Sequence, residues 1–181
     1  MTMRSFFLML CFILNFLVVF AQEPLKFAEV VLVEGAAKSE LFERATIWFN
    51  TNQRSTIGDV VLKHSNEELG ELVGEARINY TTNKNEEFKI ANGYIEYTIK
   101  ISVSDEVYNF EFSNFIHHVD ELTEKSINFD LLTYEETYPN SNNVDSKLVN
   151  KIWNDIKLKV INNSSSLIEN LKKTMSTSVE P

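Results

Sequence analysis

Two neighbouring segments near the middle of the chain alternate between apolar and polar residues. The apolar positions of the first segment are Ile95, Tyr97, Ile99, Ile101 and Val103. After a turn at Asp105–Glu106, the second segment continues the pattern with Tyr108, Phe110 and Phe112. A period of two predicts strands that turn one face to the core and the other to water, which is typical of an antiparallel sheet. This hairpin is the strongest constraint that the sequence places on the fold.

The segments before the hairpin add a helix and three further strands. Lys26–Val33 is β-branched and apolar, which predicts a strand that is buried on both faces or paired at the centre of the sheet. From Lys38 to about Asn52 the apolar residues recur at helical spacing, and Ser39 or a neighbour is expected to cap the helix. Val60–Leu62 and Leu72–Thr81 are expected to be strands. The β-α-β-β-β-β order predicts an α+β fold, with the helix packed on one face of an antiparallel sheet.

The last third of the chain follows a different pattern. Residues 120–143 are mostly polar and are expected to form a partly ordered connection. Residues 144–176 predict an amphipathic helix, because apolar residues recur four apart. The residues that mark its apolar face are Leu148, Ile152 and Ile156. We expect Asn162–Ser165 to interrupt this helix before a short second one, and residues 177–181 to fray. The helical segment either covers part of the sheet or forms a detachable appendage.

Residues 1–21 have the pattern of a signal peptide. Arg4 is the only charge before Glu23, and Phe6–Phe20 is almost wholly apolar. Ala21 supplies the small residue expected at the cleavage site, and the apolar run is short for a membrane span, which needs about 20 residues. We expect cleavage after Ala21 and export to the periplasm, the cell surface or the medium. A leader that is retained as an anchor is the alternative.

The chain after the leader is acidic and has no cysteine. Without Arg4 it has 16 basic and 26 acidic residues, a formal charge of −10. Such a surface repels phosphate backbones and anionic membranes, so we do not expect a nucleic-acid partner. The lack of cysteine in residues 22–181 excludes disulfides, a thiol nucleophile and a thiolate metal site in this part of the chain.

Three segments together resemble one protein family. Residues 37–45, Ala-Lys-Ser-Glu-Leu-Phe-Glu-Arg-Ala, with Trp48 behind them, are similar to its helix pattern SK-x-E-L-aromatic-x-R-A…W. Residues 68–74 are similar to its G-x-[IL]-x-G turn and strand, and Tyr97–Phe112 resembles its hairpin around a K-D-G-R-Y turn. The family consists of uncharacterised, exported bacterial proteins with a TATA-binding-protein-like (TBP-like) fold. The resemblance covers roughly residues 25–117.

The resemblance implies a TBP-like α+β domain over residues 22–119, and it brings no catalytic residue or cofactor. The hairpin departs from the family pattern, because Ser104 stands where Lys is usual and Glu106-Val107 where Gly-Arg is usual. We therefore expect a reshaped turn that lacks any ligand contact made by that Lys or Arg. A shared fold does not by itself imply DNA binding.

No set of residues stands out as catalytic, and we expect neither a cofactor nor a metal site. His117 and His118 precede Asp120 and Glu121, but adjacent residues of a strand point to opposite faces and cannot hold one ion together. The acidic pair Asp105–Glu106 lies on the predicted turn, where such side chains commonly form local hydrogen bonds. The sequence therefore favours a protein that is not an enzyme.

The leading hypothesis is an envelope module that binds a ligand or a protein through the outer face of its sheet. If no other element covers that face, it presents Tyr94, Thr98 and Lys100 to a peptide, a glycan or a protein. In the first alternative, a scaffold subunit docks an assembly partner through the helix stripe of Leu148, Ile152 and Ile156. The second alternative is a secreted hydrolase without a recognisable motif.

Overall fold

The computed structural model describes residues 22–53, 59–82, 85–139 and 145–177. The expected signal peptide, residues 1–21, lies outside the described residues, as do residues 178–181 of the expected tail. The described strands are β1 (Phe27–Leu32), β2 (Asp59–Asn66), β3 (Glu71–Tyr80), β4 (Gly93–Ser104), β5 (Val107–Val119) and β6 (Asp130–Leu131). The described helices are α2 (Lys38–Thr51), the 3-10 helix η1 (Glu86–Ala91) and α3 (Ser146–Ser176).

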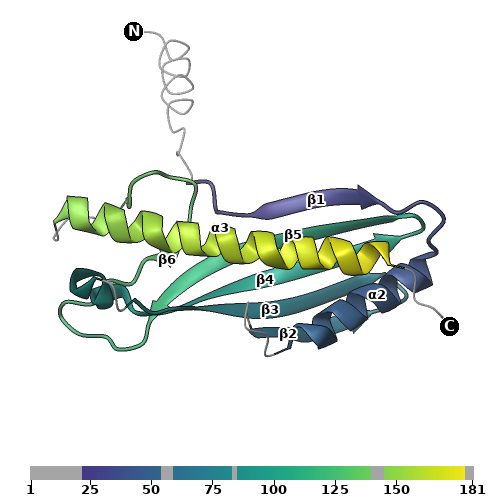
Figure 1. Ribbon diagram of the computed structural model, residues 1–181, viewed down its shortest axis with the longest axis horizontal. Coiled ribbons are helices and arrows are strands. Elements are labelled where there is room, and N and C mark those ends of the chain that lie inside the picture. Colours follow the sequence, from purple (N-terminus) through teal and green to yellow (C-terminus); the bar gives the residue numbers. More distant parts are fainter. Residues whose placement is uncertain (1–21, 54–58, 83–84, 140–144, 178–181) are drawn as a thin grey trace, which may run out of the picture.

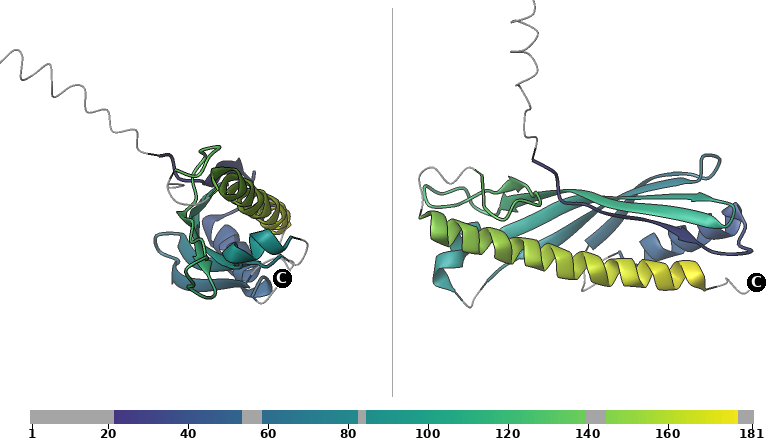
Figure 2. Two further views of the ribbon diagram at one scale, coloured as in Figure 1. Left: turned by 90° about the vertical axis from the view of Figure 1, so that its left-hand side faces the viewer. Right: turned by 90° about the horizontal axis from the view of Figure 1, so that it is seen from above.

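The strands form one antiparallel sheet in the order β1-β5-β4-β3-β2, and β6 pairs with the far end of β5. Both long helices lie on the same side of this sheet, with α3 running along it and α2 crossing near one end (Figure 1). The end-on view in Figure 2 shows the sheet curving around α3. This two-layer arrangement confirms the predicted α+β class, and the alternating burial of β4 confirms the pattern that predicted the hairpin.

A β-bulge in β5 keeps aromatic side chains in the core along the whole strand. The register with β4 shifts between Glu96 and Thr98, and Asn114 has a φ of 58°. Asparagine tolerates this left-handed conformation better than most residues do. The extra residue changes the parity of the strand, so that Phe112 and then Phe115 are both fully buried. These rings stack on Tyr97 with centroid distances of 6.0 and 4.7 Å.

The expectation that the first strand is central or buried on both faces is wrong. β1 lies at an edge of the sheet, where β5 is its one partner among the described strands, and its side chains Val30 and Leu32 are 71% and 62% exposed. β-branched residues favour an extended backbone at edge and centre alike, so this composition does not tell the two apart.

The expected break in the C-terminal helix is also absent, because α3 is one helix of 31 residues. Ser164 lies in its middle and is fully buried, on the same face as Val160 and Leu167. Asn and Ser cost only about half a kcal/mol each relative to good helix formers, whereas burying a large apolar side chain is worth roughly 1.5–3 kcal/mol. Packing against the sheet therefore outweighs the weak local preference.

The apolar stripe of α3 packs inside its own chain. Ile152 and Ile156 are fully buried and Leu148 is partly buried against the same core. The Tyr80 hydroxyl donates a hydrogen bond of 2.8 Å to the Asp155 carboxylate, which ties β3 to α3. The hypothesis that this stripe docks an assembly partner is therefore corrected, because the surface it needs is already occupied.

The connection between β5 and α3 contributes to the core. Phe129 and Leu132 are buried, and β6 between them extends the sheet beside β1.

The helix α2 differs from expectation at its start, where Ala37 takes the cap position in place of Ser39. The missing cap is supplied by the β4–β5 turn, where Asp105 Oδ1 accepts the Lys38 N–H at 2.9 Å.

Candidate functional site

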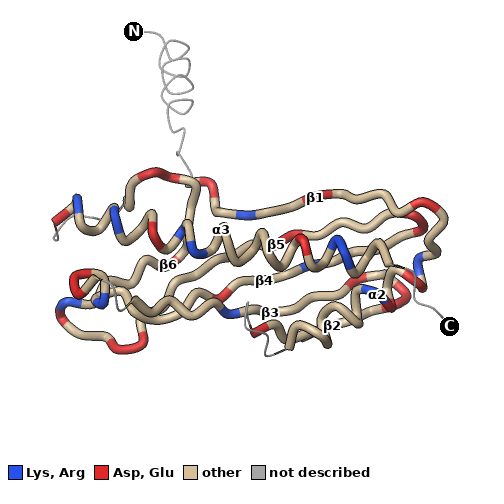
Figure 3. The backbone as a smooth tube through the Cα atoms, in the orientation of Figure 1, with Lys and Arg blue, Asp and Glu red and all other residues tan. Residues whose placement is uncertain are grey.

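One face of the sheet is left uncovered by both helices. We call it the open face and define it by the outward side chains of β2 to β5 together with those of β1. The outward residues of β1 are Ala28, Val30 and Leu32. The outward residues of the other strands include Val61, Lys63, Glu75, Arg77, Tyr94, Glu96, Thr98, Lys100, Asn109, Glu111, Asn114, Ile116 and His118. Figure 3 shows basic and acidic residues mixed along these strands.

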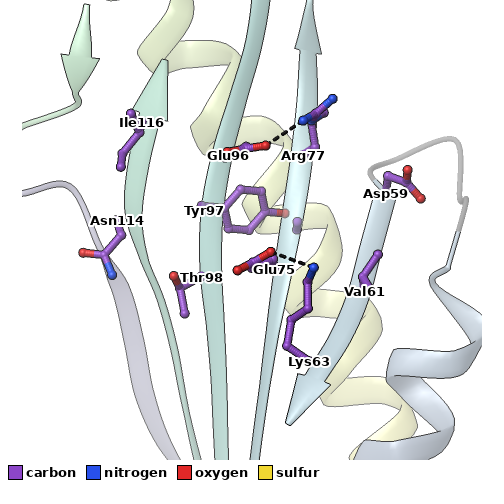
Figure 4. Close-up of a pocket in the computed structure, with 11 residues that line it drawn as sticks. Asp59, Val61, Lys63, Glu75, Arg77, Glu96, Tyr97, Thr98, Asn114 and Ile116 are labelled. Carbon is purple, nitrogen blue, oxygen red and sulfur yellow. Dashed lines mark hydrogen bonds and ion pairs between the residues drawn. The ribbon is translucent and has the colours of Figure 1, made fainter. Parts of the chain in front are cut away.

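A shallow hollow of about 500 Å³ lies on this face over β2, β3, β4 and the bulge of β5. Two cross-strand ion pairs stand over it, as Figure 4 shows. Arg77 contacts Glu96 at 2.6 Å, and Lys63 contacts Glu75 at 3.0 Å. The apolar side chains Val61 and Ile116 and the polar ones Thr98 and Asn114 complete the lining. The lining of the hollow therefore combines charged side chains of both signs with apolar ones.

An aromatic and charged cluster borders one end of the hollow. The Arg77 guanidinium lies 3.9 Å from the centre of the Tyr94 ring, a cation–π geometry. The Tyr94 ring lies 5.1 Å from that of His118, whose Nε2 is 3.7 Å from Glu96. The hydrogen bond that the Arg77 guanidinium donates to the Glu96 carboxylate raises the pKa of Arg77 above its usual value. These contacts bring the side chains of Arg77, Glu96, Tyr94 and His118 together in one partly exposed cluster.

The three residues expected on this face do not form one cluster. Thr98 lines the main hollow, and Tyr94 belongs to the cluster beside it. Lys100 lies further along β4, where it contacts Glu71 at 3.1 Å and borders a second hollow next to Val30. Tyr94, Thr98 and Lys100 all point outward from β4, because side chains of a strand alternate between its two faces. They are spread along the length of the strand and therefore do not meet at one point.

Sequence reasoning missed the residues that neighbouring strands bring to the hollow. Lys63, Glu75, Arg77 and Asn114 meet there only through the pairing of four strands and the bulge. Alternating charges in Glu71–Tyr80 were a signal that these side chains face water, but the register was needed to place them together.

The two adjacent histidines point to opposite faces, as the strand geometry predicted. His118 lies on the open face, whereas His117 is fully buried beneath η1. The Phe129 N–H donates to Nδ1 of His117 at 3.3 Å, so the ring proton is on Nε2, which lies 3.0 Å from the Ala91 carbonyl. Burial lowers the pKa of His117 below its usual value. In the described part of the chain, no three His, Cys, Asp or Glu side chains gather as a metal site would require.

The acidic pair of the β4–β5 turn has a structural use. Asp105 caps α2, and Glu106 Oε1 accepts the Gly35 N–H at 2.9 Å. Glu106 has a φ of 62°, in the left-handed region that favours glycine. It stands at the position where the K-D-G-R-Y turn pattern of the resembling family has glycine, and it adopts the backbone conformation expected of that glycine. The turn is therefore tied to the β1–α2 connection and lies apart from the hollow.

The sequence matches the model of a family described as "Domain of unknown function (DUF4468) with TBP-like fold" over residues 27–118, just over half of the chain. The chain belongs to this family. No curated protein matches it. The DUF4468 match spans β1 to β5, so the open face lies almost wholly within it.

Two solved structures show the same fold. A TBP-like protein from Parabacteroides distasonis is 16% identical with a TM-score of 0.53, over 86% of this chain and 95% of that one. A DUF4468 family protein from Bacteroides ovatus is 11% identical with a TM-score of 0.55, over 87% of this chain and 90% of that one. The likeness therefore extends beyond the family match into the C-terminal part of the chain.

The residues that carry the DUF4468 resemblance build the fold. Gly70 and Gly74 are positions where a Cβ would come within 2.3 Å of Val103 O and of Phe49 Cε1, respectively. The Lys38 ammonium donates to the Glu68 carbonyl at 2.7 Å, which fastens α2 to the β2–β3 turn. These four residues serve packing and turns and lie outside the hollow, whereas Tyr97 and Thr98 of the resembling hairpin segment line it.

Proposed function

We propose that this protein is an exported, non-catalytic binding domain of the bacterial cell envelope, which holds a protein or peptide partner on its open face. The observation that carries the proposal is the bare face itself, since both helices pack on the other side of the sheet. A broad face with a shallow hollow and charges of both signs suits the mixed polar surface of a protein better than it suits a small substrate, which binds in enclosed clefts.

Export is proposed from the leader pattern of residues 1–21 together with the family resemblance. In the described part of the chain, no helix is long and apolar enough to cross a bilayer. The net charge of −9 for the full chain supports a partner other than nucleic acid.

A secreted hydrolase is the weaker candidate. Glu75 and Glu96 both line the hollow, but each carboxylate is paired with a cation and is at least 48% exposed. General acid catalysis near neutral pH usually relies on a carboxyl group that burial or a like charge keeps protonated. Both carboxylates of the hollow are instead open to water, and each lies beside a cation.

Site-specific photo-crosslinking in the native envelope tests the binding proposal. A benzophenone side chain at Thr98 or Asn114, on the open face, should give a covalent adduct with one discrete envelope protein. The same probe at Lys159, on the exposed side of α3, is the matched control and should give none. A Thr98→Trp substitution, which fills the hollow, should weaken the adduct formed from position 114. Equal labelling from position 159, or no adduct from either open-face position, would contradict the proposal. An adduct with a glycan would show that the open face binds a carbohydrate and would overturn the protein or peptide partner.

A further inference from the structure

The outer edge of β1 has backbone groups without partners in the described part of the chain. The Leu25 N–H donates to Leu132 O at 2.9 Å, and the Val33 N–H donates to Glu106 O at 2.7 Å, both toward the interior of the sheet. Residues two apart in a strand point their backbone groups the same way, so the odd-numbered residues of β1 face β5. The residues whose N–H and C=O groups point outward are Ala28, Val30 and Leu32.

This free edge is limited at both ends. At the start of β1 the Tyr134 hydroxyl donates to the Lys26 carbonyl and lies 3.4 Å from the Lys26 amide, so it occupies the outward groups of that residue. At the other end the chain leaves the sheet through a turn at Gly35, whose φ is 76°. The free window therefore runs from Ala28 to Leu32 and is centred on Val30.

The two edges of the sheet differ in how they are protected. β2, at the far edge, has a register shift between Leu62 and His64 and a charged Lys63 at that point. Bulges and lysines are common means by which edge strands avoid pairing with other chains. β1 has neither in its window, and its outward side chains Val30 and Leu32 are 71% and 62% exposed.

We propose that β1 pairs antiparallel with β1 of a second copy of this chain, with Val30 of each copy directly opposite the other. In this register Ala28 of one copy faces Leu32 of the other, so all three outward residues form hydrogen-bonded pairs. Their apolar side chains come together on one face of the joined sheet, where cross-strand contacts between such residues are stabilising.

Charge complementarity favours a second copy as the occupant. The same register places Lys26 of one copy near Glu34 of the other, just beyond each end of the paired window. Neither side chain has an ion-pair partner in the described part of the chain. A two-fold axis between the paired Val30 residues makes the assembly a closed dimer. The sheet edges that remain free in this dimer are the two β2 strands, whose bulge and lysine disfavour further pairing. Association is therefore expected to stop at a dimer. This inference is independent of the ligand of the open face, although the dimer places both open faces on the same side.

A charge swap at the two-fold axis tests this register. Sedimentation velocity of the purified protein over a concentration series should show a monomer–dimer equilibrium. Val30→Glu and Val30→Lys each place two like charges opposite each other, and each should raise the dimer dissociation constant at least about tenfold. An equimolar mixture of the two variants should regain a dimer at least as tight as that of the wild-type protein, which also shows that both variants are folded.

The matched control is Val61→Glu, an exposed valine on the open face of the other edge strand, which should leave the dissociation constant unchanged. Val30→Cys gives a second readout, because residues 22–181 contain no other cysteine and hydrogen-bonded pairs lie within disulfide reach. It should form a covalent dimer on oxidation. A wild-type protein that stays monomeric at its highest soluble concentration, or a dimer that Val30→Glu does not weaken, would overturn the proposal.

Discussion

The buried guanidinium of Arg44 in α2 donates a hydrogen bond to the backbone carbonyl of Met175 in the last turn of α3. The same guanidinium forms an ion pair with Glu40, one turn earlier in its own helix. Arg44 is 5% exposed, so its charge is held in the interior by these two partners. One side chain thus connects the first helix of the family domain to the end of the C-terminal helix.

Replacing Arg44 with methionine should therefore loosen the end of α3. The change keeps much of the apolar stem but leaves the Met175 carbonyl without its donor, and hydrogen bonds to charged groups are worth about 1.5–3 kcal/mol. We expect a loss of free energy of unfolding in that range by urea denaturation, with faster amide exchange in the last turn of α3. Lys173→Met, an exposed residue of the same turn, should change stability by less than about 0.5 kcal/mol. Equal effects of the two substitutions would contradict this role for Arg44.

Gly74→Ala should destabilise the protein through a specific clash with α2. An added Cβ would lie 2.3 Å from Cε1 of Phe49 and 2.9 Å from the Val61 carbonyl. Overpacking of this kind typically costs about 1–3 kcal/mol. In a Phe49→Leu background the same glycine substitution should cost less, because the ring atom nearest to it is gone. A double-mutant cycle of unfolding free energies measures this coupling, and a value of zero would show that the ring is not the obstacle.

Asp105→Ala should destabilise α2 although the residue lies outside that helix. The carboxylate accepts the Lys38 N–H and places a negative charge at the helix start. Losing a cap of this kind costs about 0.5–2 kcal/mol, and Asp105→Asn, which keeps an acceptor oxygen, should cost less. Thermal unfolding of the two variants should follow this order, with Glu124→Ala in another exposed loop as the control. If Asp105→Asn and Glu124→Ala both matched Asp105→Ala, capping would not be the cause.

The local pattern was sufficient to predict the hairpin, the first helix and the layer arrangement. Apolar residues recur with a period of two from Ile95 to Val103 and with a period of about 3.6 from Leu41 to Trp48. Each period indicates the secondary structure of its own segment and nothing about which segments pair. The position of β1 at an edge was not predictable in this way, because Val30 would look the same at the centre of a sheet. Long-range pairing decides it, and the sequence of a single strand does not encode its neighbours.

The candidate site was predicted only in outline for the same reason. Tyr94, Thr98 and Lys100 were placed on the outward face by alternation, but the hollow depends on Lys63 and Arg77 from other strands. The continuity of α3 through Ser164 was missed because local propensity favoured a break there. Burial of the flanking stripe, which is visible only in three dimensions, decides the outcome.

The stability of the protein should fall in mildly acidic solution because of His117. Burial lowers the pKa of this imidazole in the folded protein, while in the unfolded chain it returns to about 6.5. Above that pH both states are neutral and the full stability is present. As the pH falls below about 6.5, the unfolded chain binds a proton that the folded protein does not, so the free energy of unfolding decreases by up to about 1.4 kcal/mol per pH unit. The loss continues until the pH reaches the lowered pKa of the folded state.

Urea denaturation at pH 7.5 and pH 5.5 measures this effect. His117→Gln removes the titrating group, so the variant should be less stable at pH 7.5 but should lose less stability than the wild-type protein on acidification. Asn109→Gln, an exposed substitution on the same strand that adds and removes no titrating group, is the control and should keep the wild-type dependence on pH. Opening of the contacts that His117 makes with Ala91 and Phe129 should accompany the loss, seen as faster amide exchange of Phe129 at the lower pH after correction for the intrinsic rate. A wild-type protein and a His117→Gln variant with the same pH dependence would show that the buried imidazole is not the group that titrates.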